Sequence, residues 1–598
     1  MKGRIMKLYN IKSLACVAFL GLALTSCEDF LDRPTEDGYD TSSYYSNDEQ
    51  CRAGVNYLYN SPWYDFQRGF IKVGEVMSGN YKQSNSPYIT FTLDGSDQYL
   101  ANMSASLWAV NTHCMTVYNN LKASTGASEE VKNACMGEAL TWKAFAYFYM
   151  VRSFGAVPII HDPLSIINSQ SATQLHKAKI SVVYDYIIMT LEKAIELLPE
   201  HDVTGKGRID KYCAKALLAK VYLTKAGFSE EHTTYNTGSN CYITCKAHQR
   251  NPEDLKKAAD LALDVIENSG RNLLPVYSDL FRGHNNVNEE CLISWAWTVS
   301  GGTWTCQNSL QSDLSPKGFS EFGDNWGQWD GVTADLIEAF GDNPLNQRRQ
   351  NVDDRRKATI MMPGDTYDYF FMEEGGLDIL KLIYQGYAKH QGQGSWDATG
   401  GGYCAKHLVG CNSDHEKEGL GVNPRDMYYG NYTHLLRLAD VYLIYCEAAM
   451  GNNTSSSDPK VLEYFYKVRH RSVKGYQYPT SITWNDIWKE RRLELAMEGD
   501  RWYDFVRRYY YDPQGAIDEL KAQKRNTYAG LDQLYKTYYD SGYTTWKVDP
   551  STMYYDTNTL PPNVTDRSFT IPMSSVDVSY NPYLLEQPED FDLSTLSF

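Results

Sequence analysis

Apolar residues follow helical spacing over most of residues 48–269, and this pattern constrains the fold more than any other feature of the chain. One stripe recurs at steps of three, four and three residues: Leu255, Ala258, Ala262 and Val265. The stretch 134–150 places small residues between large ones, which closely packed helices require. The pattern therefore predicts helices that bury one face against other helices.

The helices are expected to form antiparallel pairs. We expect helices at 181–198, 211–227, 435–449, 459–473 and 484–508. Another should begin at Asn251-Pro252, because Pro is well tolerated in the first turn. Pairs with small-residue seams are typical of tetratricopeptide-like units, so the sequence predicts helical hairpins of this type.

A glycine-rich segment without helical periodicity separates the two helical parts. Residues 301–402 hold 16 of the 43 glycines with little helical period, which predicts a loop-rich insert with short strands. Large residues alternate with small ones at Ile293, Trp295, Trp297 and Val299, as in a strand. We therefore expect Trp295 and Trp297 to lie in the core.

Three other tryptophans of the insert have polar neighbours. Trp304, Trp326 and Trp329 lie among Gly, Asp, Asn and Gln. An indole ring can stack on the flat apolar face of a sugar while amides and carboxylates bind its hydroxyls. The alternative is that each packs glycine-rich loops onto the helices.

The charge balance argues against a nucleic-acid partner. The chain has 57 Lys+Arg against 74 Asp+Glu, a net charge of −17, and its basic residues occur in no run longer than the three at 355–357. Tyrosine is abundant, with 47 residues against 20 Phe, and tyrosine favours half-wet surfaces.

Residues 1–26 have the pattern of an export signal. A basic front is followed by the apolar run 14–24, which is too short to anchor the chain in a bilayer. Small residues then precede Cys27, which resembles a bacterial lipobox. We expect acyl chains on Cys27 to hold the protein to a membrane, the alternative being an ordinary secretory signal.

The remaining cysteines give a weaker signal. Cys404, His407, Cys411 and His415 could hold zinc, but their spacing matches no standard zinc module. A Cys404–Cys411 disulfide or two free thiols are the stronger alternatives. We predict no metal and no cofactor.

Several stretches, spread from end to end, resemble the SusD/RagB family of outer-membrane nutrient-binding lipoproteins. The resemblance rests on the segments 27–34, 138–158, 211–222 and 435–449, and above all on 490–504, ERRLELAMEGDRWYD. Glu28 and Asp29 also resemble the export tag of surface lipoproteins in the Bacteroidetes.

The resemblance implies an all-α scaffold of about four tetratricopeptide-like hairpins with a loop-rich insert containing short strands. It divides the chain into a lipoprotein signal peptide (1–26), an N-terminal helical scaffold (27–290), a ligand-binding insert (291–430) and a C-terminal helical part (431–598). It also implies capture of an oligosaccharide for a SusC-like TonB-dependent barrel. The protein would then be lipid-anchored in the outer membrane and exposed at the cell surface.

Within 490–504, three acids recur every four residues: Glu490, Glu494 and Glu498. Arginines are interleaved with them, and salt-bridged carboxylates are poor general acids. We therefore predict a structural ion network.

The chain also lacks the short motifs of serine hydrolases, zinc proteases and phosphate-binding loops. No catalytic residue is predicted.

The leading hypothesis is thus a non-catalytic glycan-binding lipoprotein. Its predicted ligand contacts are Trp63, Tyr64, Asp65, Asn80, Trp304, Trp326, Trp329 and Arg355. Residues 63–65 follow Ser61-Pro62 in a loop, where side chains can face a ligand. Two other classes remain open: an extracellular helical glycosidase, and a helical scaffold that binds protein or peptide.

Overall fold

The computed structural model describes residues 44–164, 166, 174–238, 240–298, 304–316, 319, 329–347, 352–387, 401–421 and 427–598. The predicted leader over 1–26, the lipidation at Cys27 and the ligand contact at Trp326 lie outside these residues. None of the helices within the described ranges is long and apolar enough to cross a membrane.

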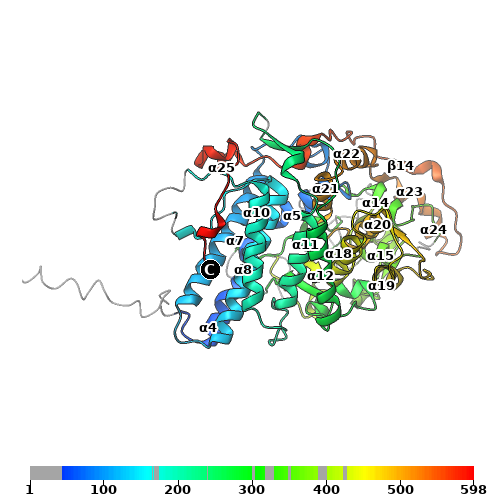
Figure 1. Cartoon of the computed structure of the whole chain (residues 1–598). Helices are drawn as coiled ribbons and strands as arrows, with labels where there is room; N and C mark the ends of the chain where they lie inside the picture. Colours follow the sequence, from blue (N-terminus) through cyan, green and yellow to red (C-terminus); the bar gives the residue numbers. More distant parts are fainter. Residues whose placement is uncertain are drawn as a thin grey trace, which may run out of the picture.

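A row of long helices forms the scaffold (Figure 1). In chain order they are α7 (Gln98–Ala123), α8 (Glu129–Phe154), α10 (Ile180–Leu197), α11 (Lys211–Lys225), α12 (Pro252–Asn268), α18 (Leu438–Met450), α19 (Pro459–Ser472) and α20 (Trp484–Glu494). Each helix packs against the next, and α12 packs directly against α18 although 169 residues separate them. The predicted all-α, tetratricopeptide-like fold is confirmed.

Local sequence determines where these helices begin. The side chains of Asp97, Ser128 and Asp210 accept hydrogen bonds from backbone N–H groups in the first turns of α7, α8 and α11. Asn251 does the same for α12, with Pro252 at its first position. The predicted start at Asn251-Pro252 is confirmed.

Shorter helices surround the scaffold. They are α4 (Asp48–Asn56), α5 (Phe66–Ile71), α6 (Pro87–Thr90), α13 (Leu310–Leu314), α14 (Ala334–Ala339), α15 (Asp354–Thr359), α16 (Ile379–Tyr384), α17 (Asn412–Lys417), α21 (Arg501–Tyr509), α22 (Pro513–Ala522), α23 (Leu531–Leu534), α24 (Lys536–Asp540) and α25 (Ser575–Tyr580). Two 3-10 turns, η2 (Ser61–Trp63) and η7 (Trp304–Cys306), and the π-helical segment η3 (Lys72–Met77) also contribute to the site described below.

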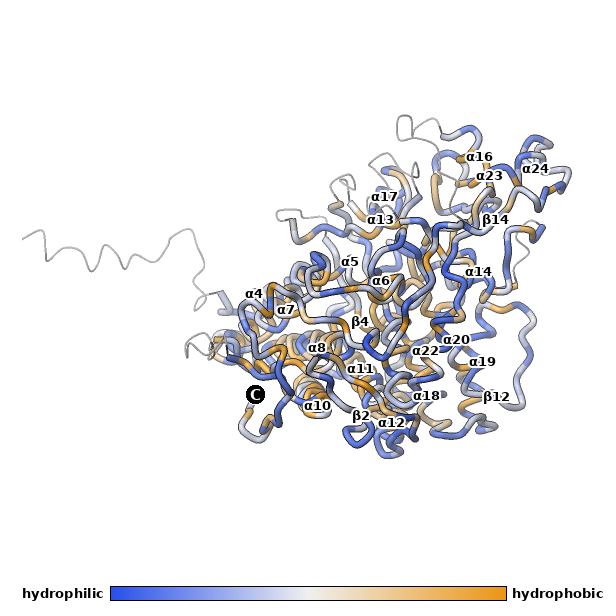
Figure 2. Tube along the Cα trace, turned by 90° about the horizontal axis from the view of Figure 1, so that it is seen from above, coloured by the Kyte–Doolittle hydropathy of each residue, from blue (hydrophilic) through white to orange (hydrophobic). Residues whose placement is uncertain are grey.

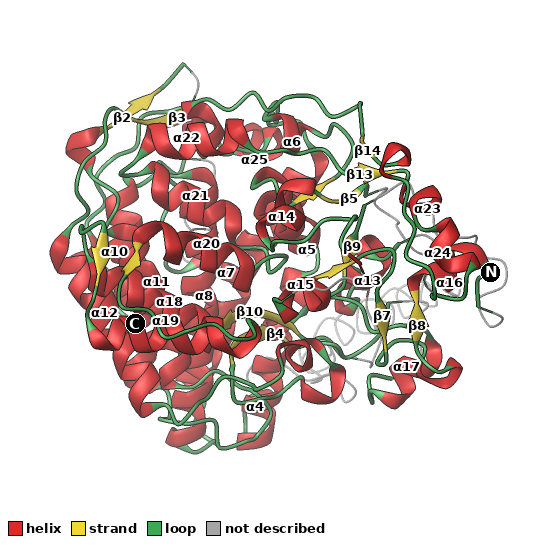
Figure 3. Cartoon of the chain, turned by 90° about the vertical axis from the view of Figure 1, so that its right-hand side faces the viewer, coloured by secondary structure: helices red, strands yellow, loops and turns green. Residues whose placement is uncertain are grey.

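Strands are short and occur in antiparallel pairs (Figure 3). The pairs are β1 (Tyr81–Lys82) with β5 (Gly331–Val332), β2 (Thr233–Asn236) with β3 (Cys241–Thr244), β4 (Cys291–Trp295) with β10 (Thr433–Arg437), β6 (Ile360–Met361) with β9 (Tyr403–Cys404), β7 (Thr366–Tyr367) with β8 (Leu377–Asp378), β11 (Ser455–Ser456) with β12 (Ile482–Thr483), and β13 (Tyr528–Ala529) with β14 (Tyr554–Tyr555). Four of these strands, β5 to β8, lie wholly between residues 301 and 402, as predicted for the insert.

Two predicted helices have different bounds. Residues 435–437 belong to strand β10, and α18 begins only at Leu438, because β10 pairs with β4 from the other side of the insert. The helix predicted over 484–508 is broken between α20 and α21, since Met497 and Gly499 both have positive φ. Gly499 is the signal that the sequence offered for this break.

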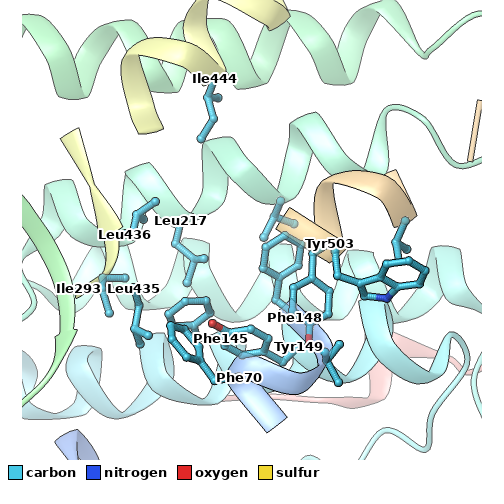
Figure 4. Packing of buried hydrophobic residues seen from close by; sticks show 14 of the residues in the cluster. Phe70, Phe145, Phe148, Tyr149, Leu217, Ile293, Leu435, Leu436, Ile444 and Tyr503 are labelled. Atoms are coloured by element: carbon cyan, nitrogen blue, oxygen red, sulfur yellow. The ribbon is translucent and has the colours of Figure 1, made fainter. Parts of the chain in front are cut away.

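One hydrophobic core joins the N-terminal and C-terminal helical parts. In Figure 4, Phe145 and Tyr149 of α8 lie near Phe70 of α5, and Leu435 and Leu436 of β10 lie near Ile293 of β4. Trp295 and Trp297 are buried, so their predicted place in the core is confirmed. The division at residues 290 and 430 stays a prediction.

The chain approaches itself closely where η3 meets the turn after α20. A Cβ on Gly74 would lie 2.3 Å from the carbonyl oxygen of Gly499, and one on Gly499 would lie 2.2 Å from the ring of Phe70. Gly499 also has a φ of +75° and donates its N–H to the buried carboxylate of Glu75 at 2.7 Å. This turn of the 490–504 segment therefore anchors the α5–η3 helix.

The acids of the same segment form a buried ion network, as predicted. Glu494 accepts hydrogen bonds from Arg355 at 3.0 Å and from Arg437 at 3.1 Å, and it also pairs with Arg471. These arginines lower the pKa of Glu494 despite its burial. Glu490 and Glu498 pair with the same group of cations, to which Lys406 and Arg469 also belong. The partners come from other elements rather than from the interleaved arginines.

Cys404 and Cys411 are free thiols, so the disulfide alternative is not adopted. His407 bonds to the carbonyl oxygen of Met497 at 2.7 Å. Over the ranges that the structure describes, no three His, Cys, Asp or Glu side chains are grouped to hold a metal ion.

Candidate functional site

Three polar side chains follow one face of the helix that runs through α5 and η3. Tyr64, Arg68 and Lys72 are spaced by four residues, which places them one above another along a helix. The helix widens into π-helical turns at Lys72, a geometry that is frequent at functional sites. We call the face formed by Tyr64, Asp65, Arg68, Lys72 and Tyr99 the α5 face.

Tyr64 and Asp65 lie at the start of this face, between η2 and α5. Tyr64 is half-buried and donates its hydroxyl hydrogen to Oε1 of Gln307 at 3.4 Å. Burial raises the pKa of Tyr64 to about 12, so the hydroxyl stays a donor at neutral pH. Asp65 is exposed, and its carboxylate can accept hydrogen bonds from a ligand.

Arg68 connects the α5 face to the loop-rich insert. Its guanidinium donates to the carboxylate of Asp313 in α13, with Nε 3.3 Å from Oδ2. The side chain of Arg68 remains 41% exposed, whereas that of Asp313 is 3% exposed. Figures 2 and 3 show α5 and α13 close together. Asp313 thus holds Arg68 in position, and the exposed part of the guanidinium can donate further hydrogen bonds to a ligand.

Lys72 lies deeper, among aromatic rings. Its Nζ lies 4.2 Å from the ring centroid of Tyr99, 5.1 Å from that of Trp329 and 5.4 Å from that of Tyr88. Burial lowers the pKa of Lys72 to about 8. It also donates a hydrogen bond to Gln83. Lys72 therefore fixes the rings that line this end of the α5 face.

The structure brings two of the predicted tryptophans near the α5 face. The backbone of Trp304 lies in η7, which contacts η2, and Thr305 shares a hydrogen bond with Ser61. The side chain of Trp304 is outside the described part. Trp329 packs on Tyr81 with ring centroids 5.6 Å apart and is only 2% exposed. Trp329 therefore supports the rings around Lys72 from within, and its predicted role as a ligand contact is corrected because the ring is buried.

Three predicted contacts are buried and bonded to protein groups, and we correct them. Trp63 is fully buried, donates its indole N–H to Leu58 at 3.0 Å and packs on the rings of Trp142 and Trp295. Asn80 is fully buried between Glu75 and Arg492.

Arg355, the third of them, is fully buried in the ion network. No surface of these three side chains is left for a ligand. Their composition resembled that of a sugar site, but burial decides their role.

Four side chains here are not among the contacts predicted from the sequence: Arg68, Lys72, Tyr99 and Asp313. The four-residue spacing from Tyr64 was the signal for Arg68 and Lys72, whereas Tyr99 and Asp313 come from distant segments. On this face Arg68 offers a partly exposed donor, Asp65 an exposed acceptor and Tyr99 a half-buried aromatic ring, whereas Lys72 and Asp313 are buried behind them. Such a combination suits a ligand that has many hydroxyl groups and flat apolar faces.

Two family models match the chain. The model described as the SusD family matches residues 295–589, and the model described as "Starch-binding associating with outer membrane" matches residues 69–223. A SusD-like protein of Bacteroides ovatus is 31% identical over 596 residues, which cover 98% of this chain and 99% of that protein. SusD-like protein P2 of Formosa agariphila is 26% identical over 72% of this chain and 75% of its own length.

Solved structures have the same fold. One crystal structure superposes with a TM-score of 0.74 at 28% identity and covers 92% of this chain and 99% of its own. A second, solved with a xylogluco-oligosaccharide, has a TM-score of 0.73 at 27% identity and covers 91% of this chain and 99% of its own.

Proposed function

The chain belongs to the SusD family, and on that premise we propose that it is a non-catalytic glycan-binding protein that binds oligosaccharides on the α5 face. The observation that carries the proposal is that half-buried Tyr64 and partly exposed Arg68 lie one turn apart on one helix face, beside the exposed carboxylate of Asp65. Sugar hydroxyls act as donors and acceptors at once, and this face supplies both.

Pre-organisation supports the proposal. The α5–η3 helix is anchored by Glu75 and Gly499, and Asp313 holds Arg68. Side chains that are already positioned lose little conformational entropy when a ligand binds. The relative solved with a xylogluco-oligosaccharide makes a plant or microbial β-glucan a reasonable first ligand to test.

Delivery to a transporter is the second part of the proposal. Acyl chains on Cys27 would hold the body at the outer face of the outer membrane, where a SusC-like TonB-dependent barrel would receive the oligosaccharide. The support for this part is the lipobox-like sequence before Cys27 and the family's association with the outer membrane.

Affinity electrophoresis of residues 28–598 against xyloglucan, laminarin, starch, xylan and mannan tests the binding proposal. We expect retention by at least one polysaccharide, and we expect Asp65→Ala to reduce it while the melting temperature is unchanged. A matched control is Asp94→Ala, because Asp94 is an exposed acid of a nearby loop outside the α5 face.

No retention by any glycan would contradict the proposal. New reducing ends in the same incubations would support a glycosidase instead, and co-purification with a barrel without glycan binding would support a scaffold.

A further inference from the structure

A groove of about 560 Å³ lies between α19 and α20, away from the α5 face. Figure 2 shows α19 and α20 at the right of the molecule, whereas α5 and α13 lie at its upper centre. The volume is within the range of about 300–1,000 Å³ that is typical of small-molecule sites. Nothing in the proposed function uses this groove.

The floor of the groove is apolar. It is lined by Phe465, Ile482, Trp488 and Leu493, with the half-buried ring of Tyr476 beside them. The indole N–H of Trp488 donates to Glu519 at 2.9 Å, which fixes the ring. A floor of this kind can cover the apolar face of a pyranose ring.

Cations dominate the lining. Four basic side chains reach the groove, from Arg469, Lys489, Arg492 and Arg501, against the two acids Asp486 and Glu519. The excess is unusual for a chain with a net charge of −17.

Both acids are already engaged by protein groups. Asp486 accepts hydrogen bonds from the backbone and hydroxyl of Thr483 at 2.8 and 2.7 Å. Glu519 accepts from Trp488 and also pairs with Arg501 and Arg508. Neither acid therefore fully neutralises the charges of Lys489 and Arg492.

The cations retain binding capacity. Arg492 donates through Nε to Asn80 and through Nη1 to Asp335, but its buried Nη2 has no hydrogen-bond partner among the described atoms. The Nε of Arg501 is in the same situation. Lys489 is exposed and forms no ion pair with the residues that the structure describes. A buried guanidinium donor without an acceptor is costly, so an anion that reached it would bind favourably.

We propose that this groove is a second saccharide site, which binds a hexuronate residue of an acidic glycan. The ring lies on the apolar floor, and the carboxylate accepts hydrogen bonds from Arg492 and Lys489. A carboxylate accepts charge-assisted hydrogen bonds from the remaining Nη2 of Arg492 and from the ammonium of Lys489, and these are stronger than the hydrogen bonds of a neutral hydroxymethyl group.

Tetragalacturonate and its fully methyl-esterified form test the proposal, because they share a backbone and differ at the carboxyl group, which is a charged carboxylate in one and a neutral methyl ester in the other. In calorimetric titrations of residues 28–598, we expect the acid to bind about tenfold more tightly than the ester, the value of one charge-assisted hydrogen bond. Salt at high concentration should weaken binding of the acid and leave the ester unchanged.

Variants locate the binding. Lys489→Gln should weaken binding of tetragalacturonate severalfold. Arg492→Gln should also weaken it, and its melting temperature is measured as well because Arg492 bonds to Asn80 and Asp335. Lys467→Gln is the matched control, because Lys467 lies on α19 outside the groove and pairs with Glu463. It should leave binding unchanged.

Failure of this inference differs from failure of the proposed function. Equal binding of acid and ester, no binding of the acid, or binding unaffected by Lys489→Gln would each overturn the second site. Loss of acid binding in Asp65→Ala would also overturn it by assigning the acid to the α5 face. Retention of neutral polysaccharides is a separate result and decides only the proposed function.

Discussion

The buried ion network around Glu494 and the α5 face around Arg68 use the same residue types in opposite ways. In the network, Arg355 and Arg437 have no exposed surface and bond only to protein groups. On the α5 face, Arg68 pairs with one buried acid and keeps 41% of its side chain exposed. Pairing and burial, rather than residue type, therefore distinguish a structural arginine from one that can bind a ligand.

Removing an arginine from the network should give the largest effect. Arg437→Ala would leave Glu290, Glu494 and Glu498 without a cation that bonds to all three. We expect the free energy of unfolding to fall by about 3–5 kcal/mol, the usual cost of breaking a buried ion pair. Urea unfolding measures it. Asp65→Ala on the α5 face is the contrasting variant. A loss of unfolding free energy there as large as that of Arg437→Ala would contradict the difference between the two regions.

The adjacent residues Trp63 and Tyr64 provide the same contrast between a buried structural side chain and one that can contact a ligand. Trp63→Ala should cost about 3–5 kcal/mol of unfolding free energy, because it removes a fully buried aromatic side chain. Tyr64→Ala should change stability by less than half as much and should weaken glycan binding. Equal losses of stability in the two variants would show that Tyr64 is a core residue as well.

Acid should destabilise the fold through two buried histidines. Burial lowers the pKa of His407 and of His434 to about 4, below the ordinary value of 6.5. The unfolded chain therefore binds more protons between these values, so stability is lost as pH falls from about 6.5 to 4, by up to about 1.4 kcal/mol per pH unit for each histidine.

Below pH 4 the loss continues, because Glu494 and Asp504 also have lowered pKa values and must be protonated. Urea unfolding at several pH values checks the slope. His434→Gln should reduce the slope above pH 4, and an unchanged slope would refute the assignment.

A smaller effect is expected for Arg68→Ala. The lost pair with Asp313 should cost about 1 kcal/mol of stability, because Arg68 is partly exposed. Glycan affinity should fall at the same time. Arg68→Lys should have an affinity between those of Arg68→Ala and the wild type, since lysine cannot form a forked pair with Asp313. Affinity electrophoresis of both variants measures this.

Much of the scaffold could be predicted from the sequence, because amphipathic spacing and caps such as Asn251 act locally. The strand at 435–437 could not, since its partner β4 lies more than 130 residues away. The sequence also placed Trp63, Asn80 and Arg355 in the site, because side-chain chemistry is visible in a sequence and burial is not. Arg68 could have been predicted from its four-residue spacing to Tyr64. Asp313 could not, because only the fold brings α13 to α5.

The most direct test of the central claim is a calorimetric titration of the wild type and of Asp65→Ala with the glycan that the wild type retains. We predict that binding by the variant is at least about tenfold weaker, the value of a hydrogen bond to a charged group, while the free energy of unfolding stays within about 0.5 kcal/mol. Unchanged affinity in Asp65→Ala would place the ligand elsewhere and contradict the assignment of the α5 face.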